Sequence, residues 1–339
     1  MKRIVFSLFL ALFMLVFTGC SCTAEAVLSF DNLWDGKTIG YSESLVYSVD
    51  FSSDYKESSF AYEKSEALSN LTVSITGAYT VVNEILSKED PSVPEKVKEN
   101  AVYKTIEHAV SVVRCSSALN LSAKYSIGDK TETSEDKIVT TAYFYNYDDS
   151  FAPIYTEREI DYKYPSVFNG EVVLTEMKGK DYVEYLSDKY VVRTEYGEGK
   201  ESETEYKHTL KTVIDNAALF LAIRNKSLDL DASYAVPVVH PSYGSSQTLA
   251  VTRFADLNKR ITFDYNGTET TVDFAVKGMS FGVNSTNSSG IKQLAFVQNG
   301  ESGGINKSLI IEYAEPLVEY SGFNKMGALV YTLKSATYA

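Results

Sequence analysis

Apolar and polar residues alternate along much of the chain with a period of two, the spacing expected of strands that bury one face. The clearest alternating segments are SLVYSVDF (44–51), ALNLSAKYSI (118–127), KIVTTAYFY (137–145) and KYVVRTEY (189–196). Turn signals separate such segments at Gly128-Asp129, at GEG (197–199) and at Asn266-Gly267. An Asn-Gly pair between two alternating segments favours a two-residue hairpin. The pattern therefore predicts a mainly β chain whose neighbouring strands are mostly antiparallel.

One segment breaks this alternation, because residues 217–223 are seven consecutive apolar residues. Asp215 precedes the run and Arg224 follows it, as is typical of a short helix: Asp accepts backbone N–H groups at the start, and Arg complements the C-terminal end of the dipole. A helix that is apolar all round has to be enclosed on most sides. We therefore expect a strongly curved antiparallel sheet, a half-barrel, around this short buried helix. The candidate cavity-lining residues are Ala218, Leu219, Phe220, Ala222 and Ile223.

A second region allows two interpretations. The sequences TVVNEILSKED (80–90) and PEKVKENAVYKTIEHAVSVV (94–113) permit helical periodicity, and the second fits a strand equally well. Pro91 and Pro94 interrupt the region. We expect residues from about 55 to 115 to be a smaller helical or extended insertion, or an extension of the sheet, within a single domain that spans residues 38–339.

The N-terminal residues indicate export. Lys2 and Arg3 precede an almost wholly apolar stretch from Ile4 to Phe17, which is shorter than the roughly 20 residues that a membrane-spanning helix needs. The sequence VFTGC that ends at Cys20 is similar to the lipobox of bacterial lipoproteins, with Phe17 where Leu, Val or Ile is usual. This resemblance implies a signal peptide at residues 1–19, a tether at 20–37, and lipidation of Cys20 that holds the protein on the extracytoplasmic face of the cell membrane. The alternative is an ordinary secretory signal that is cut elsewhere.

Charge and cysteine content narrow the classes of partner. The chain has 45 acidic and 32 basic residues, a formal charge of −13, which becomes −15 without Lys2 and Arg3. Such an acidic surface repels nucleic acid, so we expect no nucleic-acid partner. The three cysteines form neither a disulfide framework nor a metal site. A bridge between Cys22 and Cys115 is one interpretation, and a lone buried thiol at Cys115 is the other.

The search for catalytic chemistry is mostly negative. The chain contains no nucleophile elbow, Walker A motif, zinc-protease motif or dinucleotide-binding glycine motif. His240 stands near Ser242 and Ser245, but such proximity is commonly accidental. The acidic pair Glu157 and Glu159 has the spacing of glycosidase carboxylates, although a solvated strand face explains it more simply. The sequence DLDAS (229–233) lacks the glycine and glutamate of a calcium loop. We therefore expect no enzyme, no cofactor and no metal site.

Aromatic residues gather between residues 143 and 165, in YFYNYDDSFAPIYTEREIDYKYP. Alternation cannot bury all of these rings on one face of a strand. Most are expected in ordinary core and cross-strand packing, whereas some are candidates for a binding cleft, because tyrosine combines an apolar ring with a polar tip.

Three segments resemble a family of uncharacterised bacterial envelope proteins (a domain of unknown function). They are DNAALFLAIRNKSLDLDASYAVP (215–237), the closing SLIIEYAEPLVEYSGFNKMGALVYTL (308–333), and the early GYSESLVYSVDF (40–51). That family resembles in turn the half-barrel of the LolA and LolB lipoprotein carriers, in which a curved sheet encloses an apolar cavity. The resemblance covers about half of the chain and consists of packing patterns without chemical motifs. It implies a fold more directly than a function.

These observations lead to three functional hypotheses. The first is a non-catalytic, membrane-anchored surface lipoprotein that binds an apolar or amphiphilic component of the cell envelope, such as a lipid. The second is an interaction or adhesion module whose curved sheet meets a protein or polysaccharide. The third is a hydrolase. An open apolar cavity beside residues 217–223 favours the first hypothesis, and an exposed strip of aromatic residues favours the second.

Overall fold

The computed structural model describes residues 26–27, 42–53, 70–100, 111–146, 152–169, 171–197, 201–207, 214–218, 221, 224, 230, 233–239, 247–283, 293–298, 300–305, 307–316 and 327–339. The strands in chain order are β1 (Ala26–Val27), β2 (Ser42–Ser52), β3 (Leu71–Ser87), β4 (Ser111–Ile127), β5 (Lys130–Asn146), β6 (Pro153–Phe168), β7 (Glu171–Tyr185), β8 (Lys189–Tyr196), β9 (Glu201–Lys207), β10 (Ile214–Asp215), β11 (Ser233–Val239), β12 (Gln247–Tyr265), β13 (Thr268–Val283), β14 (Gln293–Gln298), β15 (Ile310–Pro316) and β16 (Ala328–Tyr338). The helical elements with described bounds are α2 (Glu95–Lys98) and the 3-10 turn η2 (Asn216–Ala218).

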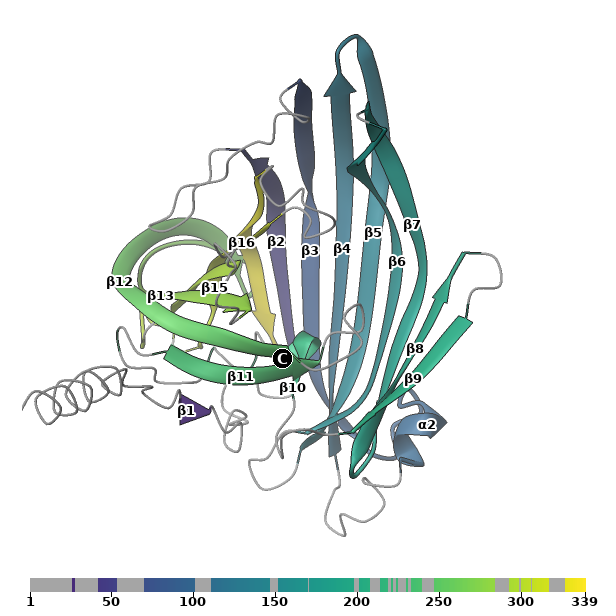
Figure 1. Ribbon diagram of the computed structural model, residues 1–339. Coiled ribbons are helices and arrows are strands. Elements are labelled where there is room, and N and C mark those ends of the chain that lie inside the picture. Colours follow the sequence, from purple (N-terminus) through teal and green to yellow (C-terminus); the bar gives the residue numbers. More distant parts are fainter. Residues whose placement is uncertain are drawn as a thin grey trace, which may run out of the picture.

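All of these strands belong to one curved sheet (Figure 1). Their order is β1-β11-β12-β13-β14-β15-β16-β2-β3-β4-β5-β6-β7-β8-β9, and β10 lies beside β11. The described pairings are antiparallel apart from three short parallel ones, β1 with β11, β10 with β11, and β12 with β16. The prediction of a mainly β chain built on a strongly curved, mostly antiparallel sheet is therefore confirmed.

The predicted turns join the long strands of this sheet. Gly128 follows β4 with a φ of 58°, and Asn266 and Gly267 join β12 to β13 with φ values of 51° and 82°. Positive φ at both central residues is the requirement of the tight hairpin turn that matches the twist of the strands, and Asn and Gly adopt it most readily. The backbone N–H of Gly267 also donates to Oδ1 of Asp264 at 2.7 Å. Local sequence therefore determines where these strands reverse direction.

One part of the sheet closes on itself. The strand β12 pairs with β13 along most of its length, and its far end, Asp264 and Tyr265, pairs with Ser335 and Ala336 of β16. A register shift after Arg253 marks a bulge, which increases the bend and twist of a strand. Strands β12 to β16 thus form a closed ring, and β16 also pairs with β2, the first strand of an open wall that runs to β9 (Figure 1). Only the wall has the open form that the sequence pattern predicts.

Residues 80–87 and 111–113 are strand, so the interpretation of this region as an extension of the sheet is confirmed there and the helical one is wrong. Residues 71–87 form β3, which pairs with β2 on one side and β4 on the other, and residues 111–113 begin β4. The β-branched residues of this region favour a pleated surface, and two neighbouring strands satisfy its backbone groups. Among the described residues of the expected region, helix is limited to α2, which begins after Pro94. Residues 101–110 lie outside the described part of the chain.

The main core lies between the inner face of the wall and the ring. The wall contributes residues at alternate positions, such as Leu45, Tyr47 and Val49 of β2. The closed ring of strands contributes large aromatic side chains such as Phe274 and Phe296. This packing explains the alternation in β2 to β5, because one face of each of these strands meets the main core.

A smaller cluster covers part of the outer face of the wall. Val93 and Val97, from the segment that contains α2, pack with Tyr143, Tyr145 and Tyr155 of β5 and β6. Phe144 points the other way, into the main core. The aromatic run is therefore buried on two faces of the sheet, as the predicted core packing requires.

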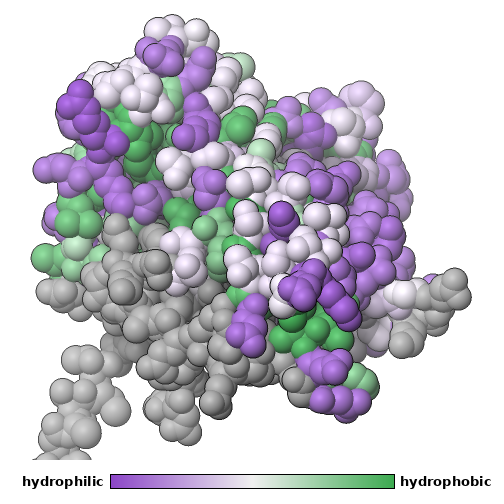
Figure 2. All heavy atoms as spheres, turned by 90° about the horizontal axis from the view of Figure 1, so that it is seen from above, coloured by the Kyte–Doolittle hydropathy of each residue, from purple (hydrophilic) through white to green (hydrophobic). Residues whose placement is uncertain are grey.

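Few large apolar side chains are exposed in the described part of the chain. Figure 2 shows the upper face as mainly hydrophilic, with hydrophobic residues in small separate groups. The exposed large hydrophobic residues are Phe168, Val173, Leu230 and Leu257. Among the described helices, none is both long and apolar enough to cross a membrane. Most apolar surface of the described strands is thus turned into the fold.

Candidate functional site

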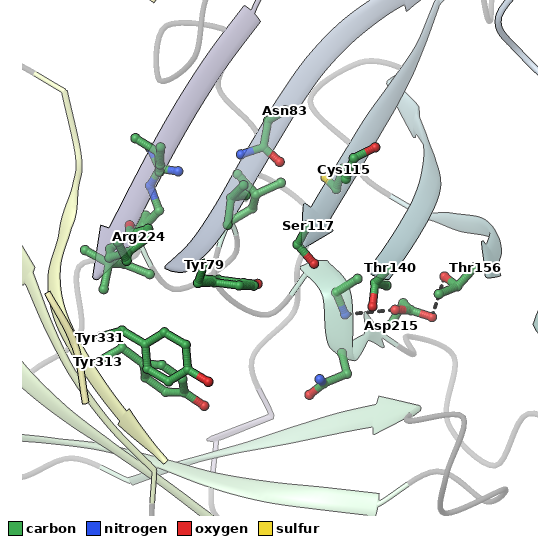
Figure 3. Close-up of a pocket in the computed structure, with 18 of the residues that line it drawn as sticks. Tyr79, Asn83, Cys115, Ser117, Thr140, Thr156, Asp215, Arg224, Tyr313 and Tyr331 are labelled. Carbon is green, nitrogen blue, oxygen red and sulfur yellow. Dashed lines mark hydrogen bonds between the residues drawn. The ribbon is translucent and has the colours of Figure 1, made fainter. Parts of the chain in front are cut away.

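A cavity of about 130 Å³ lies on the inner face of the wall, where the chain passes from β10 into η2 (Figure 3). Its lining combines aromatic and aliphatic side chains with polar ones. Strands β2 to β6 supply residues of the wall, β15 and β16 supply two tyrosines, and the segment that follows β10 supplies Ala217, Leu221 and Arg224. The cavity is therefore formed by three parts of the chain that are far apart in the sequence.

Four tyrosines form the aromatic part of the lining. Tyr79 contacts Tyr331 edge-on with ring centroids 5.4 Å apart, and Tyr331 lies 5.2 Å from Tyr313. Tyr47 lies 6.1 Å from Tyr79. These separations are typical of stabilising aromatic pairs. Burial raises the pKa of Tyr79 to about 12, so its hydroxyl stays protonated and uncharged at neutral pH.

The tips of two of these rings are held in place. The hydroxyl of Tyr313 donates to Oε2 of Glu315 at 3.0 Å, and the hydroxyl of Tyr331 donates to Oε1 of the same carboxylate. Both donors belong to neighbouring strands, β15 and β16. The carboxylate therefore fixes the orientation of two rings that face the cavity.

Asp215 stands where β10 ends and η2 begins, and it is buried. Its Oδ1 accepts the backbone N–H of Ala217 at 2.8 Å, which confirms that Asp215 accepts a backbone N–H at the start of the helical segment. Its Oδ2 accepts the hydroxyls of Tyr185 at 2.6 Å and Thr156 at 2.8 Å. Burial raises the pKa of Asp215 above its ordinary value, although these three donors oppose the shift. The carboxyl group thus ties the start of the segment to the wall.

Arg224 ties the other end of the segment to the wall. Its Nη1 and Nη2 donate to the two carboxylate oxygens of Glu43 at 2.7 and 2.6 Å, and its Nε donates to the carbonyl oxygen of Ser308 at 2.6 Å. The sequence pattern predicts Arg224 to be a charge near the end of a helix, whereas in the structure Arg224 forms a buried ion pair with Glu43. Burial opposes the charge of the guanidinium, but attraction to Glu43 outweighs it and raises the pKa of Arg224.

Asn83 of β3 lies beside this ion pair and lines the cavity. Its Nδ2 donates to Oε1 of Glu43 at 2.9 Å, which fixes the orientation of the amide. Its Oδ1 is buried and has no hydrogen-bond partner among the described residues. Figure 3 shows the nitrogen end of the amide turned toward Arg224 and the oxygen end turned away from it. A buried acceptor without a donor is uncommon and costs free energy.

The predicted plug residues are only partly described. Ala217 and Leu221 line the cavity, and Leu221 and Arg224 have helical backbone conformation and are buried. Ala218 belongs to η2, and its side chain lies outside the description. The remaining candidates lie outside the described residues, namely Leu219, Phe220, Ala222, Ile223 and the lipidation candidate Cys20. The described members of the segment thus lie at the cavity, and the candidates between them stay predictions.

Cys115 is a free, buried thiol in the cavity wall. This agrees with the interpretation of Cys115 as a lone buried thiol and not with a bridge to Cys22. Burial raises the pKa of the Cys115 thiol well above the ordinary value. A thiol that stays protonated is a poor nucleophile. Cys115 therefore serves as a small packing residue of the wall.

The other chemical candidates do not form a site in the described part of the chain. Lys96 contacts Glu157 at 3.5 Å and Lys180 contacts Glu159 at 3.9 Å, and all four side chains are exposed. These two glutamates therefore belong to a solvated strand face. No group of described His, Cys, Asp and Glu residues has the arrangement of a metal site. His240 lies outside the described residues.

Sequence reasoning missed the four tyrosines, Glu43 and Asn83. A signal for Glu43 exists, because Glu43, Leu45, Tyr47 and Val49 alternate along β2 and therefore share its inner face. A carboxylate at an inward position needs a cationic partner. Nothing in the local sequence identifies that partner, which stands 181 residues away.

Comparison with known proteins adds no assignment. No family model matches this chain, and neither a curated protein nor a solved structure matches it at a significant level. The resemblance to the LolA and LolB carriers stays a prediction. The residues of the cavity are therefore the basis on which a function can be assigned.

Proposed function

We propose that this protein is a non-catalytic, membrane-anchored surface lipoprotein that binds an apolar or amphiphilic component of the cell envelope. The observation that carries the proposal is the mixed lining of the cavity, in which tyrosines and aliphatic side chains surround one space together with hydroxyl, amide and charged groups. Concave sites with an aromatic lining and a few polar groups are typical of ligand-binding proteins. The charged groups of the described site are held by hydrogen bonds within the protein, which suits binding.

The size of the cavity limits what enters it. Its volume of about 130 Å³ is close to that of an engineered apolar cavity of about 150 Å³ that binds benzene, and it is below the roughly 300–1,000 Å³ of sites for drug-sized ligands. A whole diacyl lipid is too large. We therefore propose that one ring or one short part of a larger amphiphile occupies the cavity, with the rest of the ligand outside it.

The anchor at Cys20 is proposed from the lipobox-like sequence, because two acyl chains give stable attachment where one gives only marginal binding. Replacing Cys20 with Ala is expected to abolish diacylglycerol transfer and to leave the protein unprocessed or shed. Metabolic labelling with a fatty acid and membrane fractionation measure this. A Cys20→Ala protein that is still processed and acylated would show that the anchor is elsewhere.

Binding is tested by narrowing the cavity. Purified, delipidated protein is expected to take up an environment-sensitive apolar probe saturably and near one to one, as measured by fluorescence titration. Ala217 lines the cavity, so Ala217→Trp is expected to weaken uptake about tenfold or more by occupying the space of the probe. The free energy of unfolding of the variant should change less than its free energy of probe binding, since the side chain fills an existing cavity.

The matched control is Ala78→Trp, because Ala78 lies on β3 and its side chain is exposed. This variant should bind the probe as the natural chain does. Uptake that survives Ala217→Trp would place the probe elsewhere on the protein. A folded, delipidated sample that takes up no probe would remove the carrier proposal and leave the interaction module, with a protein or polysaccharide partner, in its place.

A further inference from the structure

The unpartnered oxygen of Asn83 indicates what kind of group the cavity receives. The side chain of Asn83 is 1% exposed, and its amide nitrogen is already committed to Glu43. The remaining lone pairs on Oδ1 need a donor, and none of the described protein groups supplies one. A buried acceptor left in this state costs free energy, which a ligand that brings an O–H or N–H group recovers.

The charged groups at the cavity are engaged within the protein. Of the described lining residues, three carry a carboxyl or guanidinium group: Arg158, Asp215 and Arg224. Arg224 pairs with Glu43, and Arg158 donates to Asp181 through Nε at 3.0 Å. Asp215 receives three hydrogen bonds from Ala217, Thr156 and Tyr185.

This arrangement disfavours a charged ligand of either sign. An anion would approach Asp215 and compete with carboxylates that already hold the two guanidinium groups. A cation would approach those guanidinium groups, which line the cavity directly, while their carboxylate partners Glu43 and Asp181 are not among the described lining residues. A neutral group avoids the repulsion that either charge would meet, and in a buried site such repulsion costs much free energy.

The polar part of the lining continues from Asn83 along neighbouring strands. Ser117 of β4 and Thr140 of β5 are register partners, and Figure 3 shows both side chains beside the cavity between Tyr79 and Asp215. Hydroxyl groups both donate and accept hydrogen bonds, so they adapt to a second polar group of the ligand. The rings of Tyr79 and Tyr331 lie beside these polar groups in the cavity lining and offer an apolar surface for a cyclic or short apolar part.

We propose that the part of the ligand bound in this cavity is uncharged and carries a hydroxyl or amide donor, which Asn83 Oδ1 accepts, next to a ring or short apolar unit held by the tyrosines. This inference rests on the proposed binding function. It distinguishes a hydroxylated or amide-bearing amphiphile from a free fatty acid, a phosphate headgroup or an amine.

The test uses four small probes that share one benzene ring and one attached carbon: benzyl alcohol, toluene, benzoate and benzylamine. Each is titrated into the purified full-length protein by calorimetry, and each is also used to displace the environment-sensitive probe. Benzyl alcohol is expected to bind at least as tightly as toluene, although transfer from water into an apolar site favours toluene. Benzoate and benzylamine are expected to bind about tenfold or more weakly than benzyl alcohol.

The variant Asn83→Leu removes the acceptor at a similar side-chain size. It should weaken benzyl alcohol about tenfold and leave toluene unchanged or tighter, because only the alcohol loses a hydrogen bond. Asn83 also donates to Glu43, so a thermal melt checks that the variant is folded. The comparison of the four probes on the natural chain needs no variant and stands if the variant does not fold.

The proposed preference for a donor group and the proposed binding function are tested by different outcomes. Tighter binding of toluene than of benzyl alcohol, or a preference for either charged probe, would overturn the inference about the donor and leave the binding function in place. The absence of uptake for all four probes and for the environment-sensitive probe would overturn both.

Discussion

Replacing Arg224 with leucine is expected to lower the free energy of unfolding by about 3–5 kcal/mol, because the substitution leaves the carboxylate of Glu43 buried without a cationic partner. The side chains of Arg224 and Glu43 are 2% and 0% exposed, so water cannot replace the lost interaction. The change also removes the donor to the Ser308 carbonyl. Denaturant unfolding followed by circular dichroism measures the loss.

The control for this variant is Arg260→Leu. Arg260 lies 3.6 Å from Asp273, and their side chains are 71% and 67% exposed. An exposed pair of this kind contributes about 0–1 kcal/mol, so the control should unfold close to the natural chain. Equal losses in Arg224→Leu and Arg260→Leu would contradict the buried position of Arg224.

A double variant separates the cost of an orphaned charge from the cost of lost packing. In Glu43→Gln combined with Arg224→Met, the buried carboxylate is replaced by a neutral amide, whose oxygen can still accept the hydrogen bond from Nδ2 of Asn83. Such replacements of a buried pair are often close to neutral. We therefore expect the double variant to be more stable than Arg224→Leu alone.

Replacing Leu221 with aspartate is the second substitution with a large expected effect. Leu221 is 6% exposed and belongs to the main core cluster. An aspartate there meets an apolar enclosure, and the guanidinium of Arg224 is already held by Glu43. We expect a loss of several kcal/mol, a large share of a typical stability of about 5–15 kcal/mol.

The same substitution at Leu257 is the matched control, because Leu257 is 40% exposed. Its carboxylate would remain in water, so Leu257→Asp should change the thermal melt little. If Leu221→Asp and Leu257→Asp melted alike, the segment that contains Leu221 would not be packed against the wall. The comparison therefore tests whether residues 217–223 form the buried plug that the sequence predicts.

The sequence alone determined the class of the fold and many local features. Alternation predicted the strands at residues 44–51, 118–127, 137–145 and 189–196, and each lies within β2, β4, β5 or β8. The Asn266-Gly267 turn was readable because its φ values depend on those two residues. These features follow from interactions between near neighbours in the chain, so a short window of sequence contains their physical cause.

Local pattern misled where neighbouring strands decided the outcome. Residues 80–87 fit helical periodicity, yet all of them pair with β4 and residues 80–84 also pair with β2. Their backbone groups are satisfied by strands that lie elsewhere in the sequence, and this pairing outweighs a weak local preference. The closure of β12 onto β16 is similar, since it depends on the bend of a whole strand and on only two residue pairs.

The candidate site shows the same division. Asp215 was identified from the sequence because its acceptor role toward the backbone of Ala217 is local. The partner of Arg224 is Glu43, 181 residues away, and the tyrosines of the cavity come from β2, β3, β15 and β16. Only tertiary structure brings these groups together, because a binding site depends on distances in space, and the curvature of the sheet that sets those distances is a property of all its strands at once.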